Sequence, residues 1–214
     1  MEQKNRYFLS SQELDFIVKT LNPTIRKYNR GELLYKKSSS EKRLFFLLSG
    51  TVYLAVENEF EGRQILEYFV KGQVLCHDML IQPNNGNCYA VAKYPCTAAL
   101  VSYEKVEKYR QIHQDAALDY LPAFIFKSSA AIMQQHCHIL QQKTIRNKLL
   151  TFLYCQAQRQ NTFTVRLPLP YSDLADYLTV DRSALMKEIS RLCSEGIIEK
   201  DSHQITLLTT TPCI

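Results

Sequence analysis

One segment near the C-terminus, Tyr171 to Leu208, constrains the fold more than any other part of the chain. Ser172 is placed to cap a short amphipathic helix, and Thr179 then interrupts the helical pattern. Asp181 is placed to cap a second helix, and Gly196 follows it in the position that a left-handed C-cap residue occupies. Two short helices joined by a tight turn predict a helix-turn-helix.

The second of these helices has two faces of different chemistry. Leu185, Ile189 and Leu192 form an apolar stripe that we expect to be buried. On the opposite face, Arg182 and Lys187 have the side chains best suited to guanine edges and phosphates. Two short strands, 197–200 and 204–208, follow as the expected wing of a winged helix. The DNA-contacting residues predicted from this pattern are Arg182, Ser183, Met186, Lys187, Ser190, Arg191 and Lys200.

The net charge of this part of the chain is too small to explain DNA binding by itself. Residues 144–214 hold 8 Lys and Arg against 7 Asp and Glu, although the whole chain has a net charge of +5. Affinity for phosphates must therefore come from the local placement of a few cations and from dimerisation. The alternative is that the two helices and the hairpin form a small satellite domain that contacts protein instead of DNA.

The N-terminal half has the pattern of an antiparallel β-protein. A helix is expected at 11–21, opened by Ser10 or Ser11, and short apolar segments separated by glycines follow it. Their regular spacing predicts a small barrel or jelly roll. The expected strands are 24–28, 33–36, 44–48, 52–56, 64–69, 74–76, 88–92 and 98–102.

A long helix is expected between these two parts, over residues 115–142. Pro122 removes one backbone donor from it, so a kink or a late helix start is expected there. A seven-residue apolar repeat along this helix predicts a seam between two copies of the chain. The repeat consists of Leu118, Ile125, Ile132 and Ile139. The alternative is a helix that packs only on the barrel of its own chain.

The composition argues against membrane, secreted and enzymatic proteins. No run of about 18 apolar residues is present and the N-terminus lacks the apolar core of a signal peptide, so a cytoplasmic location is expected. The 7 cysteines form no CxxC pair, which favours reduced thiols. Residues 1–112 contain a single histidine, His77, so a cupin-like metal enzyme would lack its ligands, and no nucleophile-elbow motif is present. We therefore expect no enzymatic activity and no metal site.

Several short motifs accompany this order of roll, long helix and winged helix. They are Gly31-Glu32, the apolar strand 45–52 with Ser49-Gly50, Gly62-Arg63, Gly72, the helix 174–178 and the segment 180–183. Together they resemble the CRP/FNR superfamily of bacterial transcription regulators over nearly the whole chain. The resemblance implies an α+β fold with an N-terminal antiparallel, jelly-roll-like β-roll over 1–112, a dimerisation helix over 113–143 and a winged helix-turn-helix over 144–214, hinged near Lys143-Thr144. It also implies a homodimer that responds to a small-molecule effector, binds a palindromic operator in double-stranded DNA and works with RNA polymerase.

The sensor part departs from the nucleotide-binding members of this family. Those members hold the ribose with a Gly-Glu pair and the cyclic phosphate with an Arg followed by Ser or Thr, whereas the corresponding positions here are Cys76-His77 and Asn87-Cys88. Without the Arg, nothing neutralises a phosphate in a half-buried pocket, which argues against cyclic AMP. The effector pocket is expected at Cys76, His77, Asn87, Cys88, Ser128 and Ile132.

Iron–sulfur clusters and haem are the sensing groups of other members of this family. Residues 1–75 contain no cysteine, so the N-terminal cysteine cluster of the iron–sulfur-sensing members is absent. Haem is an alternative, because the carbon-monoxide-sensing members place a Cys and a His as axial ligands near Cys76-His77. Adjacent strand residues point to opposite faces, however, so at most one of this pair could reach a given iron. A thiol-based sensor using Cys76, Cys88 or Cys193 is a further alternative.

Overall fold

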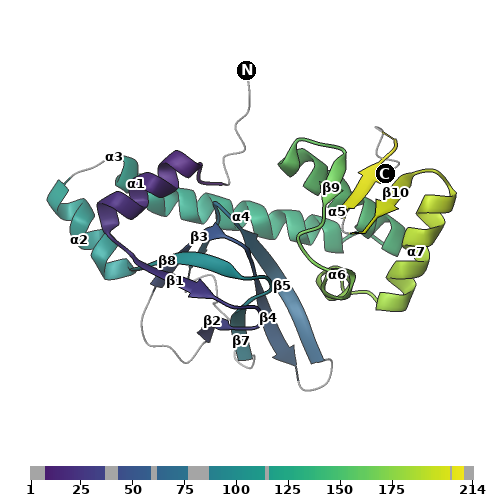
Figure 1. Ribbon diagram of the computed structural model, residues 1–214, viewed down its shortest axis with the longest axis horizontal. Helices are drawn as coiled ribbons and strands as arrows, with labels where there is room; N and C mark the ends of the chain where they lie inside the picture. Colours follow the sequence, from purple (N-terminus) through teal and green to yellow (C-terminus); the bar gives the residue numbers. More distant parts are fainter. Residues whose placement is uncertain are drawn as a thin grey trace. The chain divides into compact units, whose positions relative to one another are not determined.

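The computed structural model describes residues 8–36, 43–58, 62–76, 87–113, 116–202 and 204–209. The chain divides into two compact units, residues 1–133 and 134–214, which the ribbon in Figure 1 shows. The division falls inside helix α4 (Leu121–Leu140). Lys143 and Thr144, where the hinge is expected, lie in the turn between α4 and helix α5 (Ile145–Gln160).

The first unit begins with helix α1 (Ser11–Leu21), which starts at the expected cap. The Ser10 hydroxyl accepts a hydrogen bond from the Glu13 amide, and the Glu13 carboxylate accepts one from the Ser10 amide at 2.7 Å. This reciprocal capping box satisfies two amides that a helix start leaves without partners.

The strands of the first unit lie within one or two residues of the predicted ranges. They are β1 (Thr24–Tyr28), β2 (Leu33–Lys36), β3 (Arg43–Ser49), β4 (Thr51–Asn58), β5 (Gly62–Val70), β6 (Val74–Cys76), β7 (Asn87–Ala92) and β8 (Cys96–Ser102). They form two antiparallel sheets, in the orders β1-β8-β3-β6 and β2-β7-β4-β5. One buried apolar cluster takes Phe45 and Leu100 from the first sheet and Val52 and Phe69 from the second. The two sheets therefore share an interior, and the predicted β-roll is confirmed.

Strand β3 contributes to two cores at once. Phe45 and Leu47 belong to the interior of the roll, whereas Leu44 and Phe46 belong to a second cluster on the outer face of the sheet. Successive side chains on a strand point to opposite faces, so a continuous apolar run indicates a strand buried on both sides. The helices on this outer face are α1, α2 (Tyr103–His113), α3 (Ala116–Asp119) and the start of α4.

Gly50 allows the close turn between β3 and β4. Its φ of 81° lies in the left-handed region, and a Cβ at this position would come within 2.4 Å of the Pro95 carbonyl oxygen and of the Cys96 Cβ. Any other residue would meet backbone there, so this motif position requires glycine.

The predicted long helix is two helices in the structure. Helix α3 ends at Asp119 and α4 begins at Leu121, immediately before Pro122. Proline is tolerated in the first turn of a helix, because an N–H there has no acceptor within the helix. The late start expected at Pro122 is therefore confirmed. In the part of the chain that the structure describes, no helix is long and apolar enough to cross a membrane.

Besides the end of α4, the described residues of the second unit form three helices and a small sheet. In chain order they are α5, β9 (Thr164–Arg166), α6 (Tyr171–Leu178), α7 (Arg182–Ser194), β10 (Ile198–Asp201) and β11 (Gln204–Leu207). The sheet order is β10-β11-β9, with antiparallel pairing. Helices α6 and α7 with the β10–β11 hairpin are the predicted winged helix-turn-helix.

The start of α6 differs from the prediction that Ser172 caps it. Pro170 occupies the N-cap position without a side-chain hydrogen bond, and Ser172 lies inside the first turn, where its hydroxyl donates to Asp173 Oδ1 at 3.3 Å. Proline presets the φ needed at a helix entrance, so this helix starts by backbone geometry instead of by a hydroxyl cap.

Candidate nucleic-acid interface

The start of α7 is fixed by its predicted cap. One carboxylate oxygen of Asp181, Oδ1, accepts hydrogen bonds from the Ser183 hydroxyl and from the Ala184 amide, the latter at 2.9 Å. The Ser183 hydroxyl and then the Ala184 amide hold the pKa of Asp181 below its usual value, because both stabilise the charged form. The cap therefore stabilises α7 above the ordinary carboxyl pKa and loses this contribution as the pH falls through the lowered value.

The two faces of α7 are as the sequence predicts. Leu185, Ile189 and Leu192 are buried, each with at most 1% of its surface exposed. The predicted contact residues lie on the other face, where Arg182, Ser183, Lys187, Ser190 and Arg191 are exposed and Met186 is half-buried. The helix therefore presents a row of extended and small polar side chains to the outside.

Arg191 has an ion-pair partner that the sequence pattern did not reveal. Its Nε donates to Glu195 at 2.9 Å, and Glu195 also accepts from Arg146 on α5. Arg146 and then Arg191 hold the pKa of Glu195 below its usual value. Arg146 also lies 3.5 Å from Glu188, so it ties α5 to α7 at two points and helps to fix the orientation of the exposed row.

The wing residue Lys200 is held by an aromatic ring from α6. Its ammonium group lies 4.7 Å from the centre of the Tyr171 ring, and the Tyr171 hydroxyl donates to the Ser202 carbonyl at 3.4 Å. This contact places an exposed cation on the wing next to the helix-turn-helix. No local sequence signal predicts it, because Tyr171 and Lys200 are far apart in the chain.

The turn between α6 and α7 contains an unusual backbone conformation. Thr179 has a φ of 52°, in the left-handed region that β-branched residues rarely adopt. The Lys148 ammonium from α5 donates to the Leu178 carbonyl at 3.1 Å and to the Thr179 hydroxyl at 3.3 Å. Lys148 therefore supports the tight turn that sets the angle between the two helices.

The end of α4 packs on α6 through His136. This buried ring stacks on Tyr177 with 3.9 Å between ring centres, and its Nε2 lies 2.9 Å from the Tyr177 carbonyl oxygen. A carbonyl only accepts hydrogen bonds, so Nε2 carries the proton and donates. His136 thus satisfies one of the carbonyls that the last turn of α6 leaves open.

The residues predicted for the effector pocket are only partly described. His77 lies outside the described residues, and Cys76 and Asn87 are described only as the last residue of β6 and the first of β7. Cys88 is fully buried in the interior of the roll. On α4, Ile132 is buried, and the buried Ser128 hydroxyl donates to the Ile125 carbonyl of its own helix at 3.0 Å.

The residues predicted for the dimer seam occupy buried positions in the structure. Leu118, Ile125, Ile132 and Ile139 are all buried within this chain, and Leu118 and Ile125 belong to the cluster that packs α1 against the sheet. A different stripe of α4 is exposed, with Phe126 75% and Met133 62% accessible. Its exposed members are Ala123, Phe126, Ala130, Met133 and Cys137.

The described residues offer no metal site. No group of three or more His, Cys, Asp or Glu side chains among them could hold a metal ion. Cys96 is buried in the roll, and burial raises the pKa of its thiol to about 11, so this thiol stays protonated at neutral pH. Cys193, named above for thiol-based sensing, is half-buried as a free thiol.

Comparisons with known proteins match both units. A family model described as the cyclic nucleotide-binding domain matches residues 25–113, and one described as the Crp-like helix-turn-helix domain matches residues 147–210. The structure of FixK2 from Bradyrhizobium japonicum has a TM-score of 0.71 at 21% identity, covering 87% of this chain and 93% of that chain. The structure of a CooA mutant from Carboxydothermus hydrogenoformans has a TM-score of 0.77 at 15% identity, covering 95% of both chains. Among curated proteins, none matches this chain.

Proposed function

We propose, from the premise that this chain belongs to the CRP/FNR superfamily of bacterial transcription regulators, that it is a homodimeric, effector-responsive and sequence-specific DNA-binding regulator. The observation that carries this proposal is the exposed polar row of α7, backed by a fully buried apolar face. In a winged helix-turn-helix, such a helix enters the major groove and its side chains read base edges.

The roles of the exposed residues differ by position and chemistry. Arg182 lies at the start of α7, where a guanidinium can bind the O6 and N7 atoms of one guanine, and Lys187 lies one turn further along the same face. Ser183 already donates to Asp181, so its hydroxyl can accept from a base amino group but has no proton left to donate to a phosphate. Lys200 on the wing and Arg191 near the end of α7 are proposed phosphate contacts that add affinity without reading sequence.

The proposed dimer seam is the exposed stripe of α4. Ala123, Ala130 and Cys137 are seven residues apart, as are Phe126 and Met133, and together they alternate at the three- and four-residue spacings of a coiled-coil core. Two copies joined along this stripe would present two α7 helices to successive major grooves about 34 Å apart, which fits a palindromic operator.

The effector is proposed to bind in the first unit and to change the population of DNA-binding conformations. Cyclic AMP is not the proposed effector. Cys88 lies where nucleotide-binding members have the phosphate-binding motif, and here it is enclosed by apolar side chains. An uncompensated phosphate in such surroundings is costly. A ligand acts by binding one conformation more tightly than the other, so effector binding and DNA binding must strengthen or weaken each other reciprocally. Contact with RNA polymerase is part of the same proposal.

Selected-sequence binding with two variants tests the DNA-reading role. Arg182→Ala should weaken operator binding by about 1–3 kcal/mol per half-site and relax the preference at one base pair, because a bidentate guanine contact is lost. Lys200→Ala should weaken all sequences alike and reduce the salt dependence by about one unit of slope, because a phosphate contact is lost.

Lys19→Ala is the matched control, since Lys19 is an exposed cation on α1 in the first unit. It should leave both the affinity and the base preference unchanged. If Arg182→Ala binds the operator with unchanged affinity and preference, α7 is not the reading helix and the proposal fails.

A further inference from the structure

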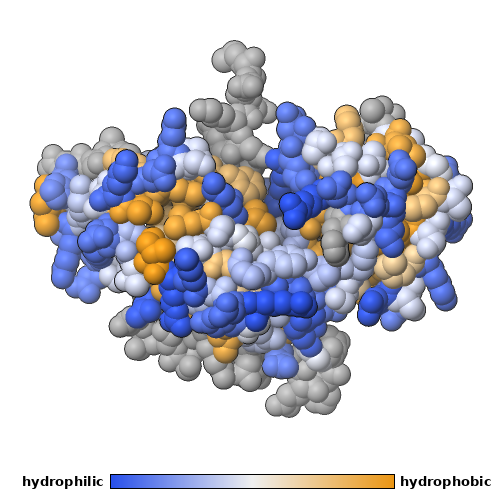
Figure 2. Space-filling view, viewed as in Figure 1, coloured by the Kyte–Doolittle hydropathy of each residue, from blue (hydrophilic) through white to orange (hydrophobic). Residues whose placement is uncertain are grey.

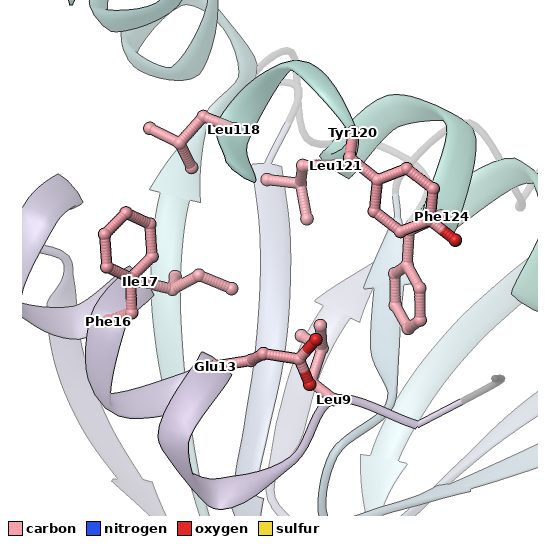
Figure 3. Close-up of a pocket in the computed structure, with 8 residues that line it drawn as sticks. All are labelled: Leu9, Glu13, Phe16, Ile17, Leu118, Tyr120, Leu121 and Phe124. Carbon is pink, nitrogen blue, oxygen red and sulfur yellow. The ribbon is translucent and has the colours of Figure 1, made fainter. Parts of the chain in front are cut away.

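A pocket of about 110 Å³ lies in the first unit, outside the interior of the roll. Figure 3 shows that α1 forms one wall and that α3 and the start of α4 form the other. The lining residues are Leu9, Glu13, Phe16, Ile17, Leu118, Tyr120, Leu121 and Phe124. None of them belongs to the apolar cluster inside the roll, so the pocket is separate from the effector site expected there.

The pocket has an apolar floor and an aromatic rim. Ile17, Leu118 and Leu121 are buried, while Phe16 and Tyr120 are 38% and 49% exposed. In the space-filling view, hydrophobic surface lies over the region of α1 (Figure 2). Aliphatic side chains at the floor and aromatic rings at the rim are a common lining of small-molecule sites.

Glu13 is the one charged residue among those that line the pocket. Its Oε2 atom is committed to the helix cap, where it accepts from the Ser10 amide at 2.7 Å, while among the described residues its Oε1 atom accepts no hydrogen bond. Figure 3 shows the carboxylate pointing into the pocket. A carboxylate at an apolar pocket attracts a ligand that combines a positive charge with an apolar body.

We propose that this pocket binds a small hydrophobic amine, with its ring or branched alkyl group between α1 and α4 and its ammonium group on Glu13. The volume of about 110 Å³ is smaller than the engineered cavity of about 150 Å³ that binds benzene, so only a small ring or branched alkyl group can enter, and the part-exposed Phe16 and Tyr120 leave the rim open to the rest of the ligand. Primary amines are protonated at neutral pH, as lysine is, so the ammonium group would donate to Oε1.

Isothermal titration of the full-length protein with 2-phenylethylamine and with 2-phenylethanol tests the proposal. The two probes share a ring and a chain and differ in the charged group. The amine should saturate a single site and bind at least about tenfold more tightly than the alcohol, because only the amine gains a charge-assisted hydrogen bond. Equal binding of both probes, or no saturation by the amine, would overturn the proposal.

Glu13→Gln isolates the charge without removing the cap, since glutamine also completes a capping box. This variant should melt at the same temperature as the wild type and should bind amine and alcohol equally. Phe16→Ala at the rim should weaken both probes, and Glu104→Gln, at an exposed carboxylate on α2, should change neither. A Glu13→Gln protein that still prefers the amine tenfold would show that the charge recognised lies elsewhere, and the assignment would fail.

Discussion

The two faces of α4 carry similar seven-residue repeats but differ in burial. The face with Ile125, Ile132 and Ile139 is buried within the chain, whereas the face with Phe126 and Met133 is exposed. Heptad spacing alone therefore does not say whether a helix packs on its own domain or on a second copy. The face of β-branched isoleucines is buried within the chain, and the face of Ala, Phe, Met and Cys is exposed.

Among the variants of α4, Ile132→Asp is expected to have the largest effect on stability. It places a charge on the buried face without a partner and should lower the free energy of unfolding by about 3–5 kcal/mol. Chemical denaturation checks this, with Ile132→Val as the control, expected to cost about 0.5–1.5 kcal/mol. If Ile132→Asp instead produced a folded monomer of undiminished stability, Ile132 would belong to the seam and the assignment of the two faces would be reversed.

Charges on the exposed face should separate the copies without unfolding them. The double variant Phe126→Glu and Met133→Glu puts like charges opposite each other in the seam and removes its two largest side chains. Sedimentation velocity should show monomers at concentrations where the wild type is a dimer, with an unchanged far-ultraviolet circular dichroism spectrum.

Ile112→Glu is the control for this experiment, because Ile112 is 72% exposed on α2 and lies away from the stripe. It should remain dimeric. A double variant that stays dimeric would show that the copies associate through another surface.

His136 extends the buried face toward α6, and its two contacts can be separated. His136→Phe keeps the ring on Tyr177 but removes the hydrogen bond that the His136 ring donates to the Tyr177 carbonyl, which should cost about 1–3 kcal/mol. His136→Gln keeps a donor but loses the stack, which should cost about 0.5–1.5 kcal/mol. Urea denaturation compares them with His138→Phe, a change at an exposed neighbour expected to be nearly neutral. Equal stability of His136→Phe and wild type would show that the hydrogen bond does not hold α4 on α6.

The smallest effect is expected for Ser128→Ala on the same face. The Ile125 carbonyl also accepts from the Ser129 hydroxyl at 2.6 Å, so removing the Ser128 hydroxyl leaves no unsatisfied group and should change stability by less than about 1 kcal/mol. Thermal denaturation is sufficient for this comparison. A loss above about 2 kcal/mol would mean that Ser128 makes a contact beyond its own helix.

The local features of this protein were predictable from its sequence. The strands of the roll, the cap at Asp181, the stop at Gly196 and the buried stripe Leu185-Ile189-Leu192 follow from spacings of two, three and four residues. These periodicities are set by backbone geometry, so neighbouring residues determine them. The order of these elements was then enough to indicate the family.

Contacts between residues that are far apart in the sequence are set by the tertiary structure. Tyr171 holds Lys200, Lys148 supports the turn at Thr179, and His136 satisfies a carbonyl of α6, each across a sequence separation that no periodicity covers. The burial of one face of α4 was set in the same way, since both faces satisfy the same repeat and, at the start of the helix, Ile125 packs in the cluster that α1 and the sheet share. Local spacing fixes which residues share a face, but the burial of that face depends on which other surfaces the folded chain brings against it.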